Sequence, residues 1–326
     1  MKLLHRRQFL HLAASAAALP AVSRVARAQA YPSRPVRILL GYAPGGAGDI
    51  VARLINQWLS GRFGQQFVIE NRPGAAGIIA TEAVVRAAPD GYTLLFFTST
   101  EVIRTTFYDK LNFNFIRDIA PVAGVNRQPL VMLVHPSFPA KTVPEFIAYA
   151  KANPGKINMA SAGNGTSTHV AGEMFKMMAG ISMVHVPYRG GAPAYTDLLG
   201  GQVGVYFAAA GSSVEYIRAG KLRALAVTTA TRSEALPDTP AVGDFLPTYE
   251  ASDWYGIVAP KNTPADIVER LNKEINAGLA DPKLRARLAD LGGTAIASSP
   301  AKFGKLIADE TEKWGKVIRA ANIKAE

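Results

Sequence analysis

The feature that most constrains this sequence is a repeated change from an apolar, strand-like run to a helix through a glycine-rich turn. The first case, "GYAPGGAGDIVARL" (residues 41–54), follows an apolar run at residues 38–40. Two more occur at residues 161–168, "SAGNGTST", and 188–201, "YRGGAPAYTDLLGG". Strands that alternate with helices in this way form a mainly parallel sheet flanked by helices, so the sequence predicts an α/β fold.

The predicted elements fall into two sets of strand–helix units followed by a mostly helical last third. Two such sets predict two lobes, with a ligand bound where the loops beyond the strand ends meet. The strands are expected at residues 36–42, 67–70, 92–98, 130–134, 157–160, 183–187, 203–208, 224–228 and 252–260.

The first glycine turn lacks what phosphate-binding loops need. A P-loop requires Lys followed by Ser or Thr after its glycines, whereas here the glycines lead to Asp49 and Ile50. A dinucleotide fingerprint requires a third glycine where this chain has Val51. What remains is a helix start whose N–H groups and positive dipole end suit a modest anion such as a carboxylate. Asp49 either caps this helix or contacts the ligand, and the sequence leaves both open.

The turn at residues 161–168 is the stronger site candidate. Gly163 and Gly165 allow the backbone to approach a ligand closely. Amide and hydroxyl groups beside a helix start can bind a carboxylate without a cation, and the turn supplies Asn164, Thr166, Ser167 and Thr168. An ordinary helix start capped by Ser or Thr is the alternative. Four aromatic residues are further candidates for a cleft wall: Tyr188, Phe207, Trp254 and Tyr255.

Several kinds of chemistry are excluded by what the sequence lacks. Because it has no cysteine, it has no disulfides, no thiolate zinc site and no thiol nucleophile. His135, His169 and His185 are the histidines after residue 30, and they lack metal-ligand spacing. No Gly-x-Ser-x-Gly elbow supports a hydrolase triad. We therefore expect no catalytic residue, metal or cofactor, and the scattered basic residues do not predict nucleic-acid binding.

The first thirty residues are predicted to be a cleaved export signal. A basic start, a short apolar middle and an Ala-x-Ala site ending at Ala30 follow the order of a secretory signal. The pair Arg6 and Arg7 also fits a twin-arginine signal, and both routes remain open. The segment carries five basic and no acidic residues, so its removal lowers the formal net charge from +11 to +6. The remaining chain is expected in the periplasm.

Several segments in one order resemble a known family. They are "YAPGGAGDIVARL", "VIENRPGAAGIIATEAVVRAAPDGYTLLF", "SAGNGTSTHVAGEMF", "VPYRGGAPAYTDLLGGQV" and "WYGIVAPKNTPADIVERLN". The chain from residue 31 onward is similar to the substrate-binding proteins of tripartite tricarboxylate transporters, the Bug receptors. The resemblance implies a two-lobed periplasmic binding protein of type II-like fold that closes on a small ligand. Lobe 1 would comprise residues 31–127 and 252–326, and lobe 2 residues 128–251.

Carried over residue by residue, the resemblance places a ligand between two loops, held by backbone N–H groups and water and not by an arginine clamp. The first-lobe residues would be Tyr42, Pro44, Gly45, Gly46, Gly48, Asp49, Thr98 and Ser99. The second-lobe residues would be Ser161, Gly163, Asn164, Gly165, Thr166, Ser167, His169, Tyr188, Gly190, Gly191 and Ala192. Glu101, in a variable segment, either favours a ligand with an amine or hydroxyl group or faces solvent.

The leading hypothesis is therefore an exported, monomeric solute-binding protein that is not an enzyme. It would capture a mono-, di- or tricarboxylate and deliver it to the membrane permease of a tripartite tricarboxylate transporter. One alternative is an exported enzyme acting on a small anionic substrate, with Asp49 and His169 as its candidate catalytic groups. Another is a binding protein that feeds a sensor kinase. The sequence does not identify the ligand.

Overall fold

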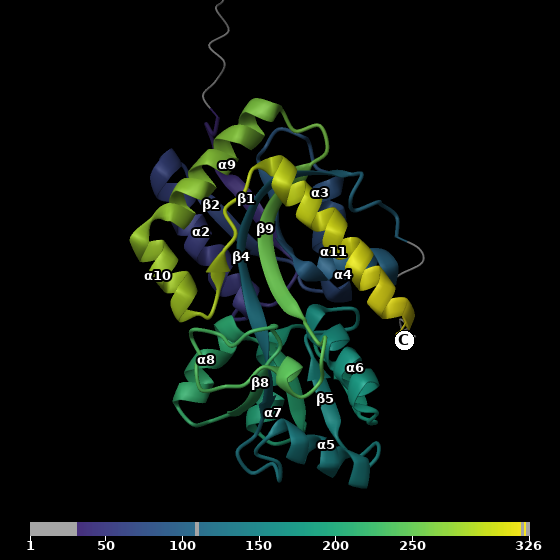
Figure 1. The fold of residues 1–326 in the computed structure, drawn as a ribbon. Helices are drawn as coiled ribbons and strands as arrows, with labels where there is room; N and C mark the ends of the chain where they lie inside the picture. Colours follow the sequence, from purple (N-terminus) through teal and green to yellow (C-terminus); the bar gives the residue numbers. More distant parts are fainter. Residues whose placement is uncertain (1–30, 108–110, 321–322, 324–326) are drawn as a thin grey trace, which may run out of the picture. The chain divides into compact units, whose positions relative to one another are not determined.

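The computed structural model describes residues 31–107, 111–320 and 323, and the predicted export signal lies outside them. Arg34–Glu326 form one compact unit. Its strands join into a ten-stranded sheet in the order β2-β1-β3-β9-β4-β7-β5-β6, with β8 and β10 also paired to β4. Helices cover the faces of this sheet, which confirms the predicted α/β fold (Figure 1).

The first strand group consists of three parallel strands, each followed by a helix. The strands are β1 (Val36–Leu40), β2 (Phe67–Asn71) and β3 (Thr93–Thr98). The helices are α2 (Ala47–Phe63), α3 (Ile78–Val85), which follows the short 3-10 turn η1 (Ala75–Gly77), and α4 (Ser99–Phe107).

The second strand group repeats the same arrangement. Its parallel strands are β5 (Asn158–Ser161), β6 (Val184–Pro187) and β7 (Val205–Ala209). The helices that follow them are α6 (Ser167–Ala179), α7 (Gly191–Leu199) and α8 (Ala210–Arg218). The neighbouring elements are α5 (Val143–Ala152), β8 (Arg223–Val227) and η2 (Val242–Asp244).

Two long antiparallel strands connect the groups, β4 (Ile119–Val134) and β9 (Ser252–Pro260). β4 pairs with β9 from Ile119 to Pro129 and then with β7 and β8 from Leu130 to Val134. β9 also pairs antiparallel with β3. This change of partner lies between Pro129 and Leu130, two residues after the predicted lobe boundary at residues 127/128. The lobe boundaries at residues 127/128 and 251/252 stay a prediction.

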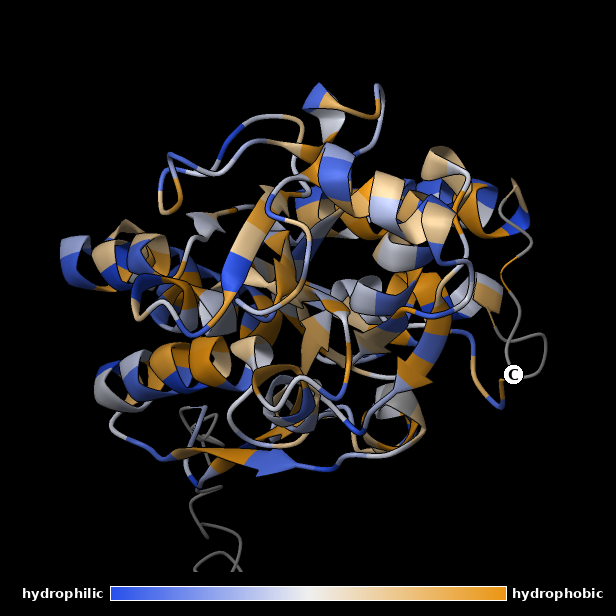
Figure 2. Cartoon of the chain, turned by 90° about the horizontal axis from the view of Figure 1, so that it is seen from below, coloured by the Kyte–Doolittle hydropathy of each residue, from blue (hydrophilic) through white to orange (hydrophobic). Residues whose placement is uncertain are grey.

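The C-terminal elements return to the first strand group. They are α9 (Ala265–Ala280), α10 (Pro282–Asp290), β10 (Thr294–Ala295) and α11 (Pro300–Ala320). α11 packs on α4 and α9 packs on β4. Aromatic residues of β3, β9 and α11 form a core here. The Phe97 ring centroid is 5.2 Å from that of Trp254 and 6.1 Å from that of Phe303. In Figure 2, hydrophobic residues lie on the strands inside the molecule and hydrophilic residues on the outer surfaces of the helices.

Helix α2 shows why a local pattern gives the predicted element. Val51, Ile55 and Leu59 recur at four-residue spacing and are fully buried, so the helix has one continuous apolar face. It ends at Gly64, whose φ of 66° is left-handed and suits a glycine helix end.

Several elements differ from the sequence prediction, which had no helix at Ala210–Arg218 (α8) and no strand at Thr294–Ala295 (β10). Ser99–Phe107 form helix α4, which the sequence analysis treated as a variable strand end. This segment is rich in β-branched residues, which form helices weakly, and it is stabilised by packing against α11. β4 is also longer than predicted, because the strand begins at Ile119 and not at Leu130.

Gly256 in β9 is expected to tolerate no side chain. A Cβ there would lie 2.1 Å from Phe303 Cζ and 2.7 Å from the Ala123 carbonyl oxygen. Gly256→Ala should therefore lower the free energy of unfolding by about 1–3 kcal/mol in urea titrations. Gly61→Ala is the matched control: it lies in α2 with nothing within 4 Å of the added Cβ, so it should raise stability by about 0.5–1 kcal/mol. Equal urea midpoints for Gly256→Ala and the parent protein would contradict this packing.

Candidate ligand-binding site

A cavity lies where the two strand groups meet. Its walls come from the loops and helix starts that follow the strands, which is where open α/β sheets bind ligands. The lining residues are Tyr42, Ala43, Gly46, Ala47, Gly48, Asp49, Thr98, Thr100, Ala162, Thr166, Ser167, Thr168, Gly191, Tyr206, Ala209, Ser212, Asp253 and Tyr255.

Five helices begin at this cavity. The first turns of α2, α4, α6 and α7 contribute Gly48, Thr100, Ser167 and Gly191, and α8 contributes Ser212. The first N–H groups of a helix have no partner within that helix. Their dipoles also place partial positive charge at this end. The cavity is therefore surrounded by backbone donors, although no Lys or Arg is among the residues that line it.

Three of these helix starts lack a cap from the side chain of their N-cap residue, which is Gly46 in α2, Gly190 in α7 and Ala209 in α8. In α8 the Gly211 N–H donates instead to Gln128 Oε1 at 2.8 Å. In α6, by contrast, the Thr166 hydroxyl accepts from the His169 N–H. Uncapped first turns leave donors for an anion that enters the cavity.

The loop before α2 is held in place by Asp49, which the sequence analysis left as either a cap or a ligand contact. Its carboxylate accepts from the Gly45 N–H at 3.1 Å, from Arg53 Nε at 2.9 Å and from Asn71 Nδ2 at 3.0 Å. Asn71 Nδ2 also donates to the Tyr42 carbonyl at 3.0 Å. Burial acts to raise the pKa of Asp49, but these hydrogen bonds outweigh it and hold the pKa below its usual value.

Close backbone contact explains a glycine at the start of this loop. A Cβ on Gly41 would lie 2.4 Å from the Cα of Gly77, so the loop after β1 touches the turn before α3. On the other side, a Cβ on Gly190 would lie 3.6 Å from the Ala43 Cβ. The loops of the two strand groups therefore meet at the cavity.

The second glycine turn is ordered by its own hydroxyl groups. Thr166 Oγ1 donates to the Gly163 carbonyl at 2.7 Å, and Thr168 Oγ1 accepts from the Ala162 N–H at 2.9 Å. The Ser167 N–H donates to Thr100 Oγ1 at 3.4 Å, which links α6 to α4. The capped helix start is therefore present. Thr166, Ser167 and Thr168 also line the cavity, and their contact with a ligand stays a prediction.

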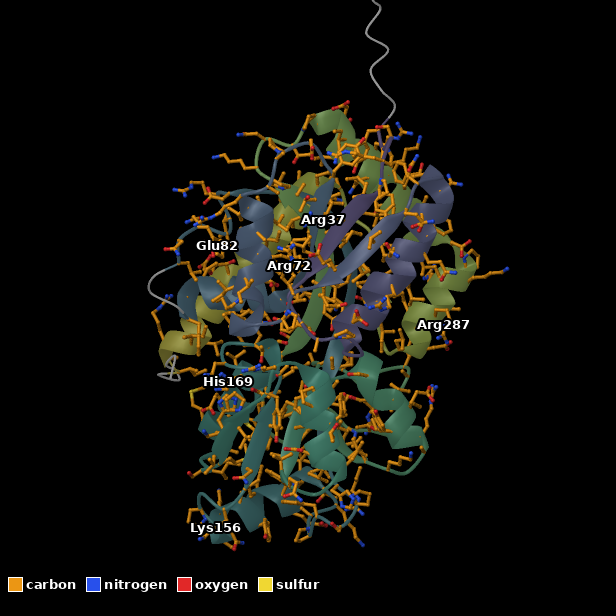
Figure 3. The ribbon with its side chains drawn as sticks, turned by 180° about the vertical axis from the view of Figure 1, so that it is seen from behind. Arg37, Arg72, Glu82, Lys156, His169 and Arg287 are labelled. Carbon is orange, nitrogen blue, oxygen red and sulfur yellow. The ribbon has the colours of Figure 1, made fainter. Side chains whose placement is uncertain are left out.

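His169 lies behind the cavity wall, in the part of the second strand group that faces the first (Figure 3). Its ring stacks on His185 with centroids 3.8 Å apart, and its Nδ1 accepts from the Gly165 N–H at 3.2 Å. Burial, together with smaller contributions from the nearby His185 and Lys176, lowers the pKa of His169 to about 3. A neutral, stacked and buried imidazole fits a structural role.

Buried hydroxyl groups and two acids give the cavity its other polar groups. Tyr42, Tyr206 and Tyr255 line it together with Asp253. Asp253 comes from the start of β9, which the antiparallel register places beside the end of β3. Glu101 does not line the cavity: its carboxylate accepts from the Thr98 N–H at 2.8 Å and from Arg104 Nη2 at 2.5 Å. The option that Glu101 faces solvent is wrong, because its side chain is 3 % exposed; its contact with a ligand stays a prediction.

A second cavity adjoins the first and shares Tyr42 and Ala162 with it. Arg189, an exposed residue, brings a cation to its wall. The side-chain oxygen of Asn164, also in this wall, is buried and has no hydrogen-bond partner within the described part of the chain.

The structure brings many of the predicted residues to these two cavities. The first is lined by Tyr42, Gly46, Gly48, Asp49, Thr98, Thr166, Ser167 and Gly191, and the second by Tyr42, Gly163, Asn164 and Tyr188. Other predicted residues lie in the same loops and do not line either cavity: Pro44, Gly45, Ser99, Ser161, Gly165, His169, Gly190 and Ala192. Their contact with a ligand stays a prediction.

The sequence reasoning missed several lining residues because they come from strands. Tyr206 lies within β7 and Asp253 at the start of β9, and only the sheet pairing brings them to the cavity. Thr100 was missed together with helix α4. Of the four aromatic candidates, Tyr255 and Tyr188 line a cavity, whereas Phe207 and Trp254 are fully buried in the core.

Within the described residues, no group of three or more metal-ligating side chains is arranged to hold an ion. Among the same residues, every helix is too short or too polar to cross a bilayer.

The Asp49 ion pair predicts a pH-dependent loss of stability. Because the pKa of Asp49 is lowered on folding, its contribution is fully present above its ordinary pKa of about 4 and is lost as the pH falls through the lower, folded value. Asp49→Asn should cost about 1–2 kcal/mol at pH 7, and the difference from the parent protein should shrink below about pH 4. Urea titrations across this range measure both.

Asp309→Asn is the control for this prediction, because Asp309 pairs with Lys305 on the exposed face of α11. Its loss should change stability by no more than about 0.5 kcal/mol. A difference between Asp49→Asn and the parent protein that stays constant down to pH 2 would contradict the assignment.

Comparison with known proteins agrees with the geometry of the site. The family model described as "Tripartite tricarboxylate transporter family receptor" matches residues 51–323 of this chain. Three solved structures are similar over nearly their whole length. They are R. palustris Rpa4515 with adipate (33 % identity, TM-score 0.88, 90 % of this chain and 99 % of that one), periplasmic binding protein BugD (32 %, 0.87, 91 % and 100 %) and MatC (Rpa3494) from Rhodopseudomonas palustris with bound malate (31 %, 0.85, 88 % and 100 %).

The match covers most of the chain, and the fold and the cavity agree with it. The predicted resemblance to Bug receptors and the periplasmic-binding-protein fold are confirmed. The family is one of solute-binding receptors and not of enzymes. This chain belongs to the tripartite tricarboxylate transporter receptor family.

Proposed function

We propose that this chain binds a small organic carboxylate in the cavity at the five helix starts. The observation that carries the proposal is the convergence of uncapped first turns on a cavity that no Lys or Arg lines. Backbone N–H groups and helix dipoles recognise an anion there without the desolvation that a buried cation would require. The similar structures that hold adipate and malate support a carboxylate as the ligand.

We further propose that binding draws the two strand groups together. Residues 31–127 with 252–326 would form one lobe and residues 128–251 the other, with β4 and β9 as the connecting strands. A ligand that contacts α2 and α4 on one side and α6, α7 and α8 on the other favours the closed arrangement by its differential affinity for it. The contacts between Ala43 and Gly190, and between Thr100 and Ser167, mark where the closing surfaces meet.

The proposed biological role is capture and delivery. The chain would act as a monomer in the periplasm and pass its ligand to the membrane permease subunits of a tripartite tricarboxylate transporter. Its proposed export signal ends at Ala30. Family membership supports this role.

An enzymatic role has little support in this geometry. The Ser161 hydroxyl lies 2.6 Å from His185 Nε2, which resembles the nucleophile–base pair of a hydrolase. Ser161 is fully buried, however, and it does not line either cavity. Asp49 is engaged by Arg53, and His169 lies behind the wall.

A thermal-shift screen of small mono-, di- and tricarboxylates tests the ligand proposal. A ligand at 100 times its Kd should stabilise the protein by about 2.7 kcal/mol. Ala162→Leu adds bulk at the wall shared by both cavities, so it should weaken that ligand at least about tenfold in calorimetric titrations. The control is Ala152→Leu, an exposed position at the end of α5, which should bind like the parent protein.

Failure of every carboxylate to shift the melting temperature would overturn the proposal. Equal affinity of Ala162→Leu and Ala152→Leu for a ligand that does bind would instead place the site elsewhere on the molecule.

Export is tested on the full-length chain in its native type of host. The mature protein should be recovered from the periplasmic fraction with Tyr31 as its first residue. Replacing Arg6 and Arg7 by Lys should stop export if the twin-arginine route is used and leave it intact if the general route is used. Recovery of the uncleaved chain from the cytoplasm alone would contradict export.

A further inference from the structure

Asp253 is the one acid lining the cavity whose neighbours, in the described part of the chain, are all neutral. It is 6 % exposed and lies at the start of β9. Its Oδ2 accepts from the Tyr255 hydroxyl at 2.7 Å, and its Oδ1 accepts from the Ser99 hydroxyl. The Ser167 hydroxyl and the Trp254 N–H also lie near this carboxylate and stabilise its charge.

These donors are themselves fixed. Gln128 Nε2 donates to the Tyr255 hydroxyl at 2.5 Å, and Gln128 Oε1 accepts from the Gly211 N–H at 2.8 Å. The chain of contacts runs from α8 through β4 to β9, so the carboxylate cannot easily turn away from the cavity. A rigid acceptor of this kind is suited to discriminate between ligands.

The other two acids near the cavity are compensated by cations. Asp49 lines the cavity but pairs with Arg53, and Glu101 pairs with Arg104 outside the lining. No Lys or Arg of the described residues forms an ion pair with Asp253. A buried carboxylate without a cation is costly, and a second carboxylate brought close to it would add repulsion.

Hydrogen-bond capacity points to what would compensate this charge. An ionised carboxylate has about four acceptor positions, and the hydrogen bonds from the Ser99 and Tyr255 hydroxyls leave acceptor capacity for a donor in the cavity. Burial also raises the pKa of Asp253 above its usual value, which measures how poorly its charge is compensated without a further donor. A hydroxyl or ammonium group on the ligand would supply that donor.

We infer that Asp253 selects, among small carboxylates, those that also carry a hydroxyl or ammonium group, which donates a hydrogen bond to its carboxylate. The ligand then lies with one carboxylate toward the helix starts and its donor toward β9. This inference rests on the proposed carboxylate function and names the subclass of ligand. Sites built around a ligand donor discriminate strongly against analogues that lack it, because the buried acceptor is then left unpaired.

The test compares ligands that differ at one carbon atom. Glutarate, 2-hydroxyglutarate and glutamate share a five-carbon dicarboxylate skeleton and carry hydrogen, hydroxyl or ammonium at one position. Propionate, lactate and alanine form the corresponding monocarboxylate series. Calorimetric titration at about pH 7, with both enantiomers of each chiral ligand, gives the ratio of affinities within each series.

The parent protein should bind a hydroxyl- or ammonium-bearing member at least about tenfold more tightly than the plain member of the same series. In Asp253→Asn, whose amide can itself donate to a carboxylate, that ratio should fall below about threefold or reverse. Asp49→Asn is the matched control: it removes the other lining carboxylate, which is already paired, and should keep the parent ratio even if all affinities fall.

Three results would overturn the inference. In the first, the parent protein binds glutarate and propionate as tightly as their donor-bearing partners. In the second, Asp253→Asn keeps the full ratio. In the third, Asp49→Asn loses the ratio just as Asp253→Asn does. The first needs no variant, so a folding defect of Asp253→Asn does not remove the test, and Asp253→Ser gives a second, smaller replacement. Strong binding of plain carboxylates would leave the proposed function intact, whereas binding of no carboxylate at all would overturn both.

Discussion

The first N–H groups of every helix need an acceptor that the helix does not provide. In this structure five helices begin at one cavity, because each follows a strand of the sheet and the strands of both groups end there. Side chains satisfy part of that need in α6 and, through Gln128, in α8, but α2 and α7 begin without a side-chain cap. The cavity therefore has excess donor capacity from the backbone alone. The anion selectivity that we propose is a consequence of strand and helix order before any charged side chain is considered.

That arrangement requires the loops to approach one another closely, and glycine makes this feasible at particular points. Gly41 lies against the backbone of Gly77, and Gly190, with φ of 125°, lies close to Ala43 of the first strand group. A side chain at Gly41 would separate two backbones that now touch. The glycine-rich turns thus serve backbone packing first, and this explains why they resemble phosphate-binding loops without having the lysine or the glycine spacing of those loops.

The sequence predicts the parts of this structure that depend on local pattern. The change from apolar run to glycine turn to periodic helix is local, so β1 with α2 and β5 with α6 were recognised with only small shifts of their ends. Helix α4 was not recognised, because its β-branched residues disfavour a helix and its stability comes from α11, some 200 positions later in the chain. Tyr206 and Asp253 could not be assigned to the cavity for a related reason. Their positions follow from which strands become neighbours, and a single sequence does not determine that pairing.

The three acids around the cavity show how neighbours decide the role of a carboxylate. Glu101 attracted attention in the sequence because it follows β3, yet Arg104 and the Thr98 N–H use its oxygens inside α4. Asp49 faces the cavity, but Arg53 and Asn71 make it a support for the loop. Asp253, which no motif marked, keeps acceptor capacity toward the cavity, because the two hydroxyl groups that hydrogen-bond to it are uncharged and do not use all of its acceptor positions. A receptor that recognises a carboxylate through backbone donors gains little selectivity from that contact alone, since all carboxylates present the same group. Selectivity must then come from the opposite wall, where Asp253 is the charged group that a ligand would have to satisfy.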